Sequence, residues 1–153
     1  MFLSIILIFG GCNRKNDCEQ EAEPLSHFKS FEVSVPSGWI SSGNTTKFYY
    51  NDTYPATYLL IGEDVEPEED IAKNLELFES TSFYQNKIKF VYEVYEGEKV
   101  SGVLVNERLE KNLCFTGYYL EVPKAYIFCV SESFENKDFI AELVDDVYSS
   151  LVS

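Results

Sequence analysis

Two neighbouring segments, residues 113–122 and 125–131, are apolar on both faces when they are drawn as β-strands. Successive side chains of a strand point to opposite faces, and here both alternating sets are apolar. One set holds Cys114, Tyr118, Leu120, Ile127 and Cys129, and the other holds Phe115, Tyr119, Tyr126, Phe128 and Val130. Strands of this kind belong in a sheet that is covered on both sides. The pair, joined by a turn near Val122 and Pro123, therefore predicts the centre of a covered sheet.

Two segments with helical periodicity can supply that cover. Residues 67–81 begin at Pro67 among acidic residues, and Ile71, Leu75 and Phe78 recur at helical spacing. Proline suits the first position of a helix, and acidic side chains favour its N-terminus. Residues 135–152 form an amphipathic surface helix, whose start Ser133 or Asn136 can cap. Its apolar stripe consists of Ile140, Leu143, Val144, Val147, Tyr148 and Leu151.

Shorter strands are expected on either side of the first helix. Residues 31–35 alternate with period two, residues 47–51 and 56–62 are apolar between turn-rich stretches, and residues 87–96 and 100–107 form a hairpin around Gly97. In residues 87–96, one face holds Ile88, Phe90, Tyr92 and Val94. The fold class expected is α+β, with an antiparallel sheet of about six to seven strands sandwiched between helices. At 153 residues, one domain is the default, which we place at residues 28–153.

The N-terminal segment predicts export and lipid anchoring at Cys12. Residues 2–9 are almost unbroken hydrocarbon, which suits the apolar region of a signal peptide and falls short of the roughly 20 residues that span a bilayer. Gly10 and Gly11 then precede Cys12, and this pattern resembles the lipobox of prokaryotic lipoproteins. Phe9 stands where that motif usually has Leu, and no Lys or Arg precedes the cysteine. The alternative is a short buried N-terminal strand or helix.

The resemblance to lipoproteins sets the expected domain organisation and location. It implies that residues 1–11 are a removable signal peptide and that Cys12 carries diacylglycerol. Residues 12–27 are polar and acidic, and we expect them to form a flexible tether. Stable anchoring takes two acyl chains, so diacylation suffices. The domain is then expected in the periplasm or outside the cell, held by lipid to the cell membrane or the outer membrane.

Composition restricts the partners of this chain. Asp and Glu number 26 against 12 Lys and Arg, giving a formal net charge of -14. A nucleic-acid ligand is not expected, because phosphate contacts need clustered basic residues. The 12 Phe and 11 Tyr residues are enough to build a core, which excludes a disordered chain.

No combination of residues predicts an enzyme or a cofactor. His27 is the only histidine and lies at the end of the tether, where a solvated linker residue is the favoured interpretation. Cys18, Cys114 and Cys129 lack the spacing of a zinc site. If the turn between their strands is centred near Pro123, Cys114 and Cys129 lie diagonally, which favours two buried free thiols over a disulfide.

Three further features have both a functional and a structural interpretation. The acidic residues of the segment 63–70 could hold a hard cation, but they lack EF-hand spacing, so a solvated helix N-terminus is favoured and no metal is expected. Trp39 could be a ligand platform, although such a residue more often closes the end of a core. Asn44 and Asn51 begin sequences with the form of glycosylation sites.

Two motifs resemble the PsbP-like family. The run of residues 31–39, Phe-Glu-Val-Ser-Val-Pro-Ser-Gly-Trp, is similar to the family's opening strand and its Pro-x-Gly-Trp turn. The strand at residues 126–130, which leads into a helix ending Val147-Tyr148-Ser149-Ser150-Leu151, is similar to the family's close. The resemblance covers roughly residues 28–152. It implies an antiparallel sheet between helices, and binding or assembly rather than catalysis. A cystatin-like roll, with a helix on one face of a bent sheet, is the alternative fold.

Together these observations predict a lipid-anchored envelope protein that acts as a non-catalytic binding or assembly module, with a protein partner that the sequence does not identify. A module that binds a cation or a small ligand is the first alternative. A hydrolase that acts through carboxylates is the second, and it needs two such groups facing each other in a concave pocket.

Overall fold

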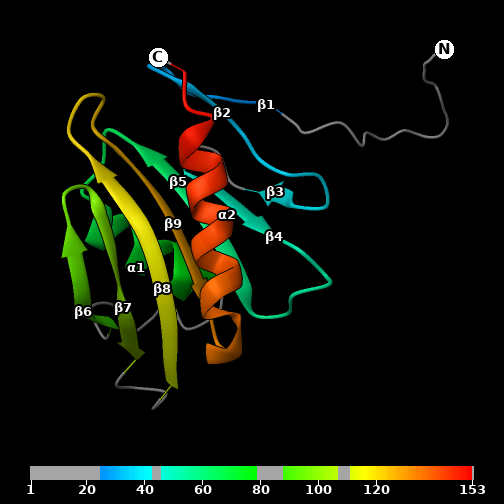
Figure 1. The fold of residues 1–153 in the computed structure, drawn as a ribbon, viewed down its shortest axis with the longest axis vertical. Helices are drawn as coiled ribbons and strands as arrows, with labels where there is room; N and C mark the ends of the chain where they lie inside the picture. The colour runs from blue at the N-terminus through cyan, green and yellow to red at the C-terminus, as the bar shows by residue number, and fades with distance from the viewer. Residues whose placement is uncertain (1–24, 43–45, 79–87, 107–110, 153) are drawn as a thin grey trace, which may run out of the picture.

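The computed structural model describes residues 25–42, 46–78, 88–106 and 111–152, and Figure 1 shows their arrangement. The strands of this part of the chain are β1 (Leu25–His27), β2 (Glu32–Ser34), β3 (Ile40–Ser42), β4 (Lys47–Tyr50), β5 (Thr57–Glu63), β6 (Ile88–Glu96), β7 (Lys99–Asn106), β8 (Lys111–Leu120) and β9 (Ala125–Ser131). The helices are α1 (Pro67–Phe78), the short 3-10 helix η1 (Phe134–Asn136) and α2 (Lys137–Ser149).

Seven of these strands form one antiparallel sheet in the order β3-β4-β5-β9-β8-β7-β6. β1 and β2 pair with each other in a separate two-stranded sheet. The predicted α+β class is therefore confirmed. The two strands expected at the centre, β8 and β9, lie inside the sheet with Leu120 opposite Ala125.

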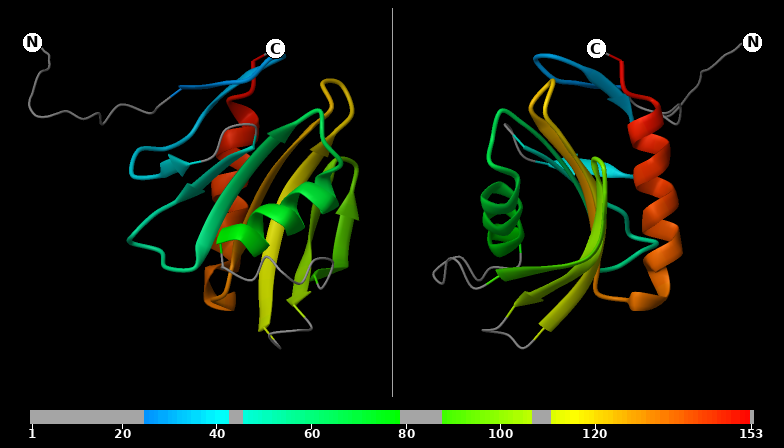
Figure 2. Two further views of the ribbon diagram at one scale, coloured as in Figure 1. Left: turned by 180° about the vertical axis from the view of Figure 1, so that it is seen from behind. Right: turned by 60° about the vertical axis from the view of Figure 1, so that its left-hand side comes forward.

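The sheet is covered by a helix on each face (Figure 2). α1 lies against one face, and α2 lies against the other together with the β1–β2 hairpin. This layering differs from a cystatin-like roll, in which the helix packs on one face. It also explains why β8 and β9 are apolar on both sides, since each face meets a different helix.

The two faces carry two separate hydrophobic clusters, and the assignment of residues 113–131 to these faces is confirmed. The α2-side core includes Cys114, Ile127 and Cys129 and is mostly aliphatic. The α1-side core includes Phe115, Tyr126 and Phe128 and is rich in aromatic rings. Adjacent residues of β9 thus belong to different cores, and all seven residues of that strand are buried.

Both helices dock as their periodicity predicts, with differences at the ends. α1 begins at Pro67 and buries Ile71 and Leu75. The segment expected to be one helix from residue 135 is a 3-10 turn followed by α2, which ends at Ser149. The expected cap was wrong, because neither Ser133 nor Asn136 makes a side-chain capping bond. The Asn136 amide instead donates to Ser131 Oγ at 3.2 Å, tying the helix start to β9.

A β-bulge in β6 overturns one predicted side-chain position. Tyr92 lies opposite Gly102, but the next pair is Val94 with Ser101, so Glu93 is an extra residue. The extra residue reverses the alternation, as bulges do. Val94, expected on the face of Ile88 and Tyr92, is 49% exposed.

Gly102 makes the bulge possible. A Cβ placed on this residue would lie 2.1 Å from the Val91 carbonyl oxygen. Glycine in a strand often marks such a close backbone approach.

Two short strands were not foreseen. β3 lies in a stretch that was expected to be a polar turn, and β1 lies in residues 25–27, which were assigned to the flexible tether. The domain therefore begins at least three residues earlier than expected. The second strand of the β1–β2 hairpin is held to the C-terminal segment, because Glu32 and Val152 exchange two backbone hydrogen bonds of 2.9 Å each. Polar, three-residue strands carry too little periodicity to be recognised.

The helices of the described ranges were compared with the length and hydrophobicity that a membrane-spanning helix needs. None of them is long and apolar enough to cross a bilayer.

Candidate functional site

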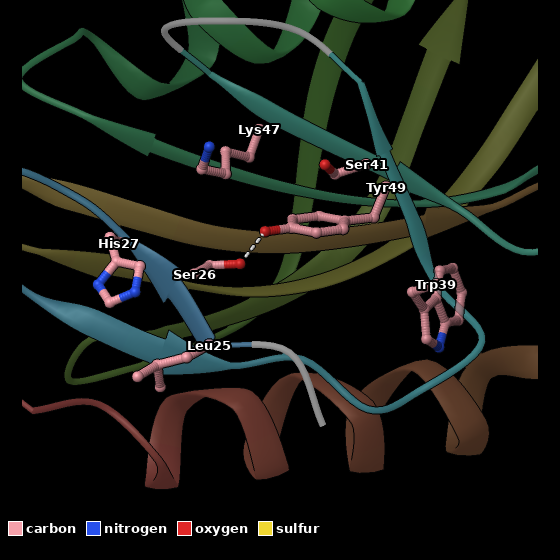
Figure 3. Close-up of a pocket in the computed structure, with 7 residues that line it drawn as sticks. All are labelled: Leu25, Ser26, His27, Trp39, Ser41, Lys47 and Tyr49. Atoms are coloured by element: carbon pink, nitrogen blue, oxygen red, sulfur yellow. Dashed lines mark hydrogen bonds between the residues drawn. The ribbon is translucent and has the colours of Figure 1, made fainter. Parts of the chain in front are cut away.

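A pocket of about 290 Å³ opens between β1 and the β3–β4 edge of the sheet (Figure 3). We call it the Lys47 pocket, and its walls are Leu25, Ser26, His27, Trp39, Ser41, Lys47 and Tyr49. Ser41 and Tyr49 lie directly opposite each other on β3 and β4, and Lys47 follows on the same face by strand alternation. β1 lies across this face and supplies the remaining polar wall. The pocket therefore exists because the unforeseen strands β1 and β3 are formed.

The ammonium of Lys47 sets the charge of this pocket. Its Nζ lies 5.8 Å from the centre of the Phe28 ring, within cation–π range. Among the described residues no carboxylate forms an ion pair with it. Lys99 and Lys124 differ in this respect, because they pair with Asp145 at 3.0 Å and with Glu66 at 2.6 Å. Lys47 thus carries a positive charge that no acidic side chain of the described residues pairs with, although the chain as a whole is acidic.

The floor of the pocket is a buried tyrosine. The Tyr49 hydroxyl points at Ser26 on β1 and forms a short hydrogen bond with it (Figure 3). Burial raises the pKa of this phenol, and the bond to Ser26 opposes the rise only in part. The floor therefore stays neutral at physiological pH, and the Ser26 bond holds β1 over β4.

His27 and Trp39 lie at opposite sides of the pocket (Figure 3). The side chain of His27 is 67% exposed, and its Nδ1 lies 2.8 Å from Glu32 Oε2 on β2. This histidine was expected in a linker, but it belongs to β1 and to the pocket wall. Trp39 is only 8% exposed, and its ring lies nearly parallel to the rings of Tyr54 and Phe139, which supports its expected structural role. Trp39 also lines the pocket, and its role as a ligand platform stays a prediction.

A second, larger hollow of about 350 Å³ lies between the β6–β7 and β8–β9 turns. We call it the Tyr95 hollow, and it is lined by Tyr95, Gly97, Glu98, Tyr119, Leu120 and Glu121. The Tyr119 amide donates to the Glu98 carbonyl at 2.9 Å, which fixes the two turns side by side. Gly97 has φ of +61°, a conformation that glycine adopts without strain, and it closes the first turn.

The acidic residues of the segment 63–70 do not converge on one point. Glu63 accepts from the amides of Lys29 and Ser30, both at 2.7 Å, in the β1–β2 turn. Glu66 pairs with Lys124, and Asp70 accepts hydrogen bonds from Thr46 and the buried Tyr126 at 2.5 and 2.6 Å. Within the described ranges no group of three or more His, Cys, Asp or Glu side chains is placed to hold a metal ion. These acidic side chains mainly connect α1 and the end of β5 to the β1–β2 turn, to β9 and to the residues beside them.

The two cysteines of the central strands are buried free thiols, as predicted. Cys114 lies opposite Ser131, and Cys129 lies opposite Thr116, so the two thiols are diagonal neighbours. Burial raises the pKa of both thiols. Because the thiolate is the reactive form, these cysteines are unreactive parts of the core.

Several predicted residues lie outside the described part of the chain. Cys12, Cys18 and Asn44 are among them. Asn51 is described, and its side-chain oxygen accepts the Thr53 amide at 2.9 Å in a local turn.

Comparison with the models of known protein families gave no match, and comparison with the curated proteins gave none either. A solved structure from Bacteroides thetaiotaomicron VPI-5482 is similar over 81% of this chain with 14% sequence identity and a TM-score of 0.39. This chain spans 45% of the length of that structure.

Sequence reasoning missed most of the residues of both hollows. Ser26, Ser41, Lys47 and Tyr49 meet only because β1 folds over β4, a contact between distant parts of the chain that periodicity does not report. Turns at Gly97 and around Pro123 and Lys124 were expected, but their contact requires β7 to pair with β8. Gly102 is the one local indication of the bulge that precedes Tyr95.

Proposed function

We propose that this protein is a lipid-anchored, non-catalytic binding module of the cell envelope, whose Lys47 pocket takes a small ligand with an anionic group. The observation that carries this proposal is the ammonium of Lys47, which faces the pocket without a carboxylate partner among the described residues. A buried or half-buried charge is stabilised by an opposite charge, so a carboxylate or a phosphate is the complementary ligand group.

The rest of the pocket supports a ligand with an apolar body. Trp39 and Leu25 offer hydrocarbon surface, and Ser41 offers a hydroxyl that can donate to an anion. A volume of about 290 Å³ suits a small molecule. His27 is held by Glu32, so it supplies a polar wall rather than a base aimed into the pocket.

The lipid anchor at Cys12 belongs to the same proposal. The apolar segment, the two glycines and the cysteine support it, as argued from the sequence. Leu25 lines the pocket and lies 25 − 12 = 13 residues after Cys12. A chain of that length reaches about 45 Å at most when fully extended. An anchored protein would therefore keep its pocket close to the membrane surface.

We also propose that the domain is PsbP-like. The antiparallel sheet with a helix on each face supports this relationship, and so do the motifs at residues 31–39 and 126–151. Such a relationship favours binding over catalysis.

The pocket is tested by thermal unfolding in the presence of sodium acetate, sodium phenylacetate or inorganic phosphate, against sodium chloride at equal ionic strength. A ligand that binds only the folded state raises the melting temperature. We expect at least one anion to do so for the wild type and for Lys124→Gln, and not for Lys47→Gln. Phenylacetate should act more strongly than acetate, because Trp39 and Leu25 bury its ring. The proposal fails if none of these anions acts, or if Lys47→Gln responds like the wild type.

The anchor is tested by fractionating cells that express Cys12→Ala, with Cys18→Ala as the matched control. Cys12→Ala should move the protein from the membrane to the soluble fraction, whereas Cys18→Ala should leave it in the membrane. A Cys12→Ala protein that stays with the membrane would refute the anchor.

A further inference from the structure

We propose that the Tyr95 hollow binds an organic ammonium ion between its tyrosine rings and its glutamates. This site lies apart from the Lys47 pocket, and its ligand has the opposite charge. The inference does not rest on the anion proposal or on the lipid anchor.

One wall of the hollow is aromatic. Tyr92, Tyr95 and Tyr119 form a connected cluster, with ring centres 5.6 Å apart for Tyr92 and Tyr95 and 6.4 Å apart for Tyr92 and Tyr119. The β6 bulge brings Tyr95 to the side of Tyr92, because the extra residue reverses the alternation. Tyr95 is nevertheless 66% exposed. A large ring that is held by the backbone yet open to solvent is a surface on which a ligand can pack.

The lining of the hollow carries negative charge. Glu98 and Glu121 lie on the two turns, and the lining contains no Lys, Arg or His. The Glu98 carboxylate also accepts a hydrogen bond from the Tyr148 hydroxyl of α2 at 2.8 Å. The neighbouring cations are already neutralised, since Lys99 pairs with Asp145 and Lys124 pairs with Glu66. The hollow is therefore acidic, and the positive charges of Lys99 and Lys124 beside it are already paired.

The tyrosines add no charge of their own. Tyr119 forms a hydrogen bond with Tyr92 at 3.0 Å, and Tyr92 in turn donates to Glu68. Burial raises the pKa of both phenols, and the negative charge of Glu68 adds to this effect. The rings stay neutral and keep the electron-rich faces that attract cations.

The combination of rings and carboxylates selects the class of cation. Calcium takes six to eight oxygen ligands, whereas this lining offers two carboxylates, on two different turns, together with Leu120 and two tyrosines. An alkylated ammonium ion matches such a lining, because its carbon surface packs on the rings while its charge faces the glutamates. The volume of about 350 Å³ is at the small end of ligand sites.

Quaternary ammonium groups occur as free molecules and as phosphatidylcholine headgroups. The headgroup carries a phosphate, which the glutamates of the hollow and the net charge of -14 would repel. We therefore assign the free ion, and the experiment separates the two sources.

The test is an NMR titration of the full chain with Cys12→Ala, which removes the proposed anchor, using choline chloride as the probe. We expect saturable shifts of the backbone amides of Gly97 and Leu120, and no such shifts with sodium chloride. Tyr95→Ala should weaken choline binding by about two- to fivefold, the effect of one exposed cation–π contact. Glu121→Gln should weaken it further when it is combined with Tyr95→Ala.

Three controls keep the result unambiguous. Tyr95→Phe should retain binding, because it keeps the ring. Phe134→Ala should also retain it, because this exposed ring lies in η1 and outside the hollow. Flotation of the same protein with phosphatidylcholine vesicles tests the headgroup.

The proposal is overturned if choline gives no saturable shift at Gly97 and Leu120, or if the double variant binds like the wild type. Binding to vesicles without binding to free choline would also overturn it. Failure of the anion test on the Lys47 pocket would leave this result unchanged, because the two hollows share no residue.

Discussion

The two faces of the sheet are built from different kinds of side chain. The α2-side core is mostly aliphatic and is closed by α2 and the β1–β2 hairpin. The α1-side core is dominated by phenylalanine and tyrosine. Aliphatic side chains have no polar atoms and can be sealed completely, whereas each tyrosine hydroxyl needs a partner.

Both sides of the sheet contain buried polar groups, but the partners of these groups differ. On the α1 side, Tyr126 is fully buried and donates to Asp70, and Tyr92 donates to Glu68, so the aromatic core reaches acidic groups of α1. The Tyr95 hollow continues this pattern at the margin of the sheet. On the α2 side, Lys99 and Tyr118 bind Asp145 at the rim, and two hydroxyl pairs are buried in the interior, Tyr49 with Ser26 and Thr57 with Ser131. The tyrosine hydroxyls of the α1 side thus meet carboxylates of α1, whereas the buried hydroxyls of the α2 side meet other hydroxyls.

The largest expected effect compares neighbouring residues of β9 that face opposite cores. Phe128→Ala should destabilise the protein by about 3–5 kcal/mol, and Ile127→Ala by about 2–4 kcal/mol. Both side chains are fully buried. The Phe128→Ala variant should lose more stability because the ring of Phe128 stacks on Phe115 and Tyr119, with ring centres 4.9 and 5.8 Å apart. Each of these contacts is worth about 0.5–1.5 kcal/mol beyond burial. Urea unfolding at equilibrium measures both losses, and an equal or larger loss for Ile127→Ala would contradict the comparison.

An intermediate effect is expected at the bulge that sets Tyr95 on the aromatic side. Gly102→Ala should cost about 1–3 kcal/mol, because the added methyl group meets the Val91 carbonyl and the strand must shift. Ser101→Ala, on the adjacent residue and the opposite face, is the control and should change stability little. Thermal unfolding of both variants is the measurement. A Gly102→Ala protein as stable as the wild type would mean that the bulge does not require glycine at position 102.

The smallest effect lies at the rim of the α2 side. Burial acts to raise the pKa of the Asp145 carboxyl, but hydrogen bonds from Tyr118 and Lys99 and the charge of Lys99 outweigh it, so the pKa lies below its ordinary value. A carboxyl with a lowered folded-state pKa stabilises the protein above its unfolded-state value of about 3.9, and this contribution disappears as the pH falls through the folded-state pKa. Since the side chain is 45% exposed, the contribution should stay below about 1 kcal/mol.

This effect is measured as the difference in unfolding free energy between the wild type and Asp145→Asn at neutral and at acidic pH. The difference should shrink in acid. Asp146→Asn, the exposed neighbour, should show no comparable difference. A difference that is independent of pH would show that the Lys99 pair does not act through its charge.

Sequence periodicity predicted the elements that bury a long apolar face. The two-sided pattern of residues 113–131 assigned Cys114 and Phe115 to opposite cores, and the stripe of Ile140 and Val147 predicted the docking of α2. These features depend on the spacing of apolar residues within a single element, which can be seen directly in the sequence. The position of Pro67 predicted the start of α1 in the same way.

The features that were missed depend on contacts between distant segments. β1 and β3 are short and polar, and each is stabilised by a neighbouring strand rather than by its own pattern. The bulge changes the direction of Val94 and Tyr95 without a change in composition. In the sequence, Lys47 is the polar end of a strand, and it lines a pocket only because β1 lies over β4. A pocket assembled from strands that are distant in the sequence therefore cannot be recognised from periodicity.

The bulge has a consequence for the solubility of the protein. β6 is the outer strand of the sheet, nine residues long, with Val91 and Val94 exposed. A long, flat and apolar outer strand invites pairing with a strand of another molecule, the first step of aggregation. The extra residue Glu93 twists this strand and interrupts its regular edge, and Lys89 and Glu96 place charges along it. The irregularity that directs Tyr95 toward the hollow thus also protects the open side of the sheet from uncontrolled assembly.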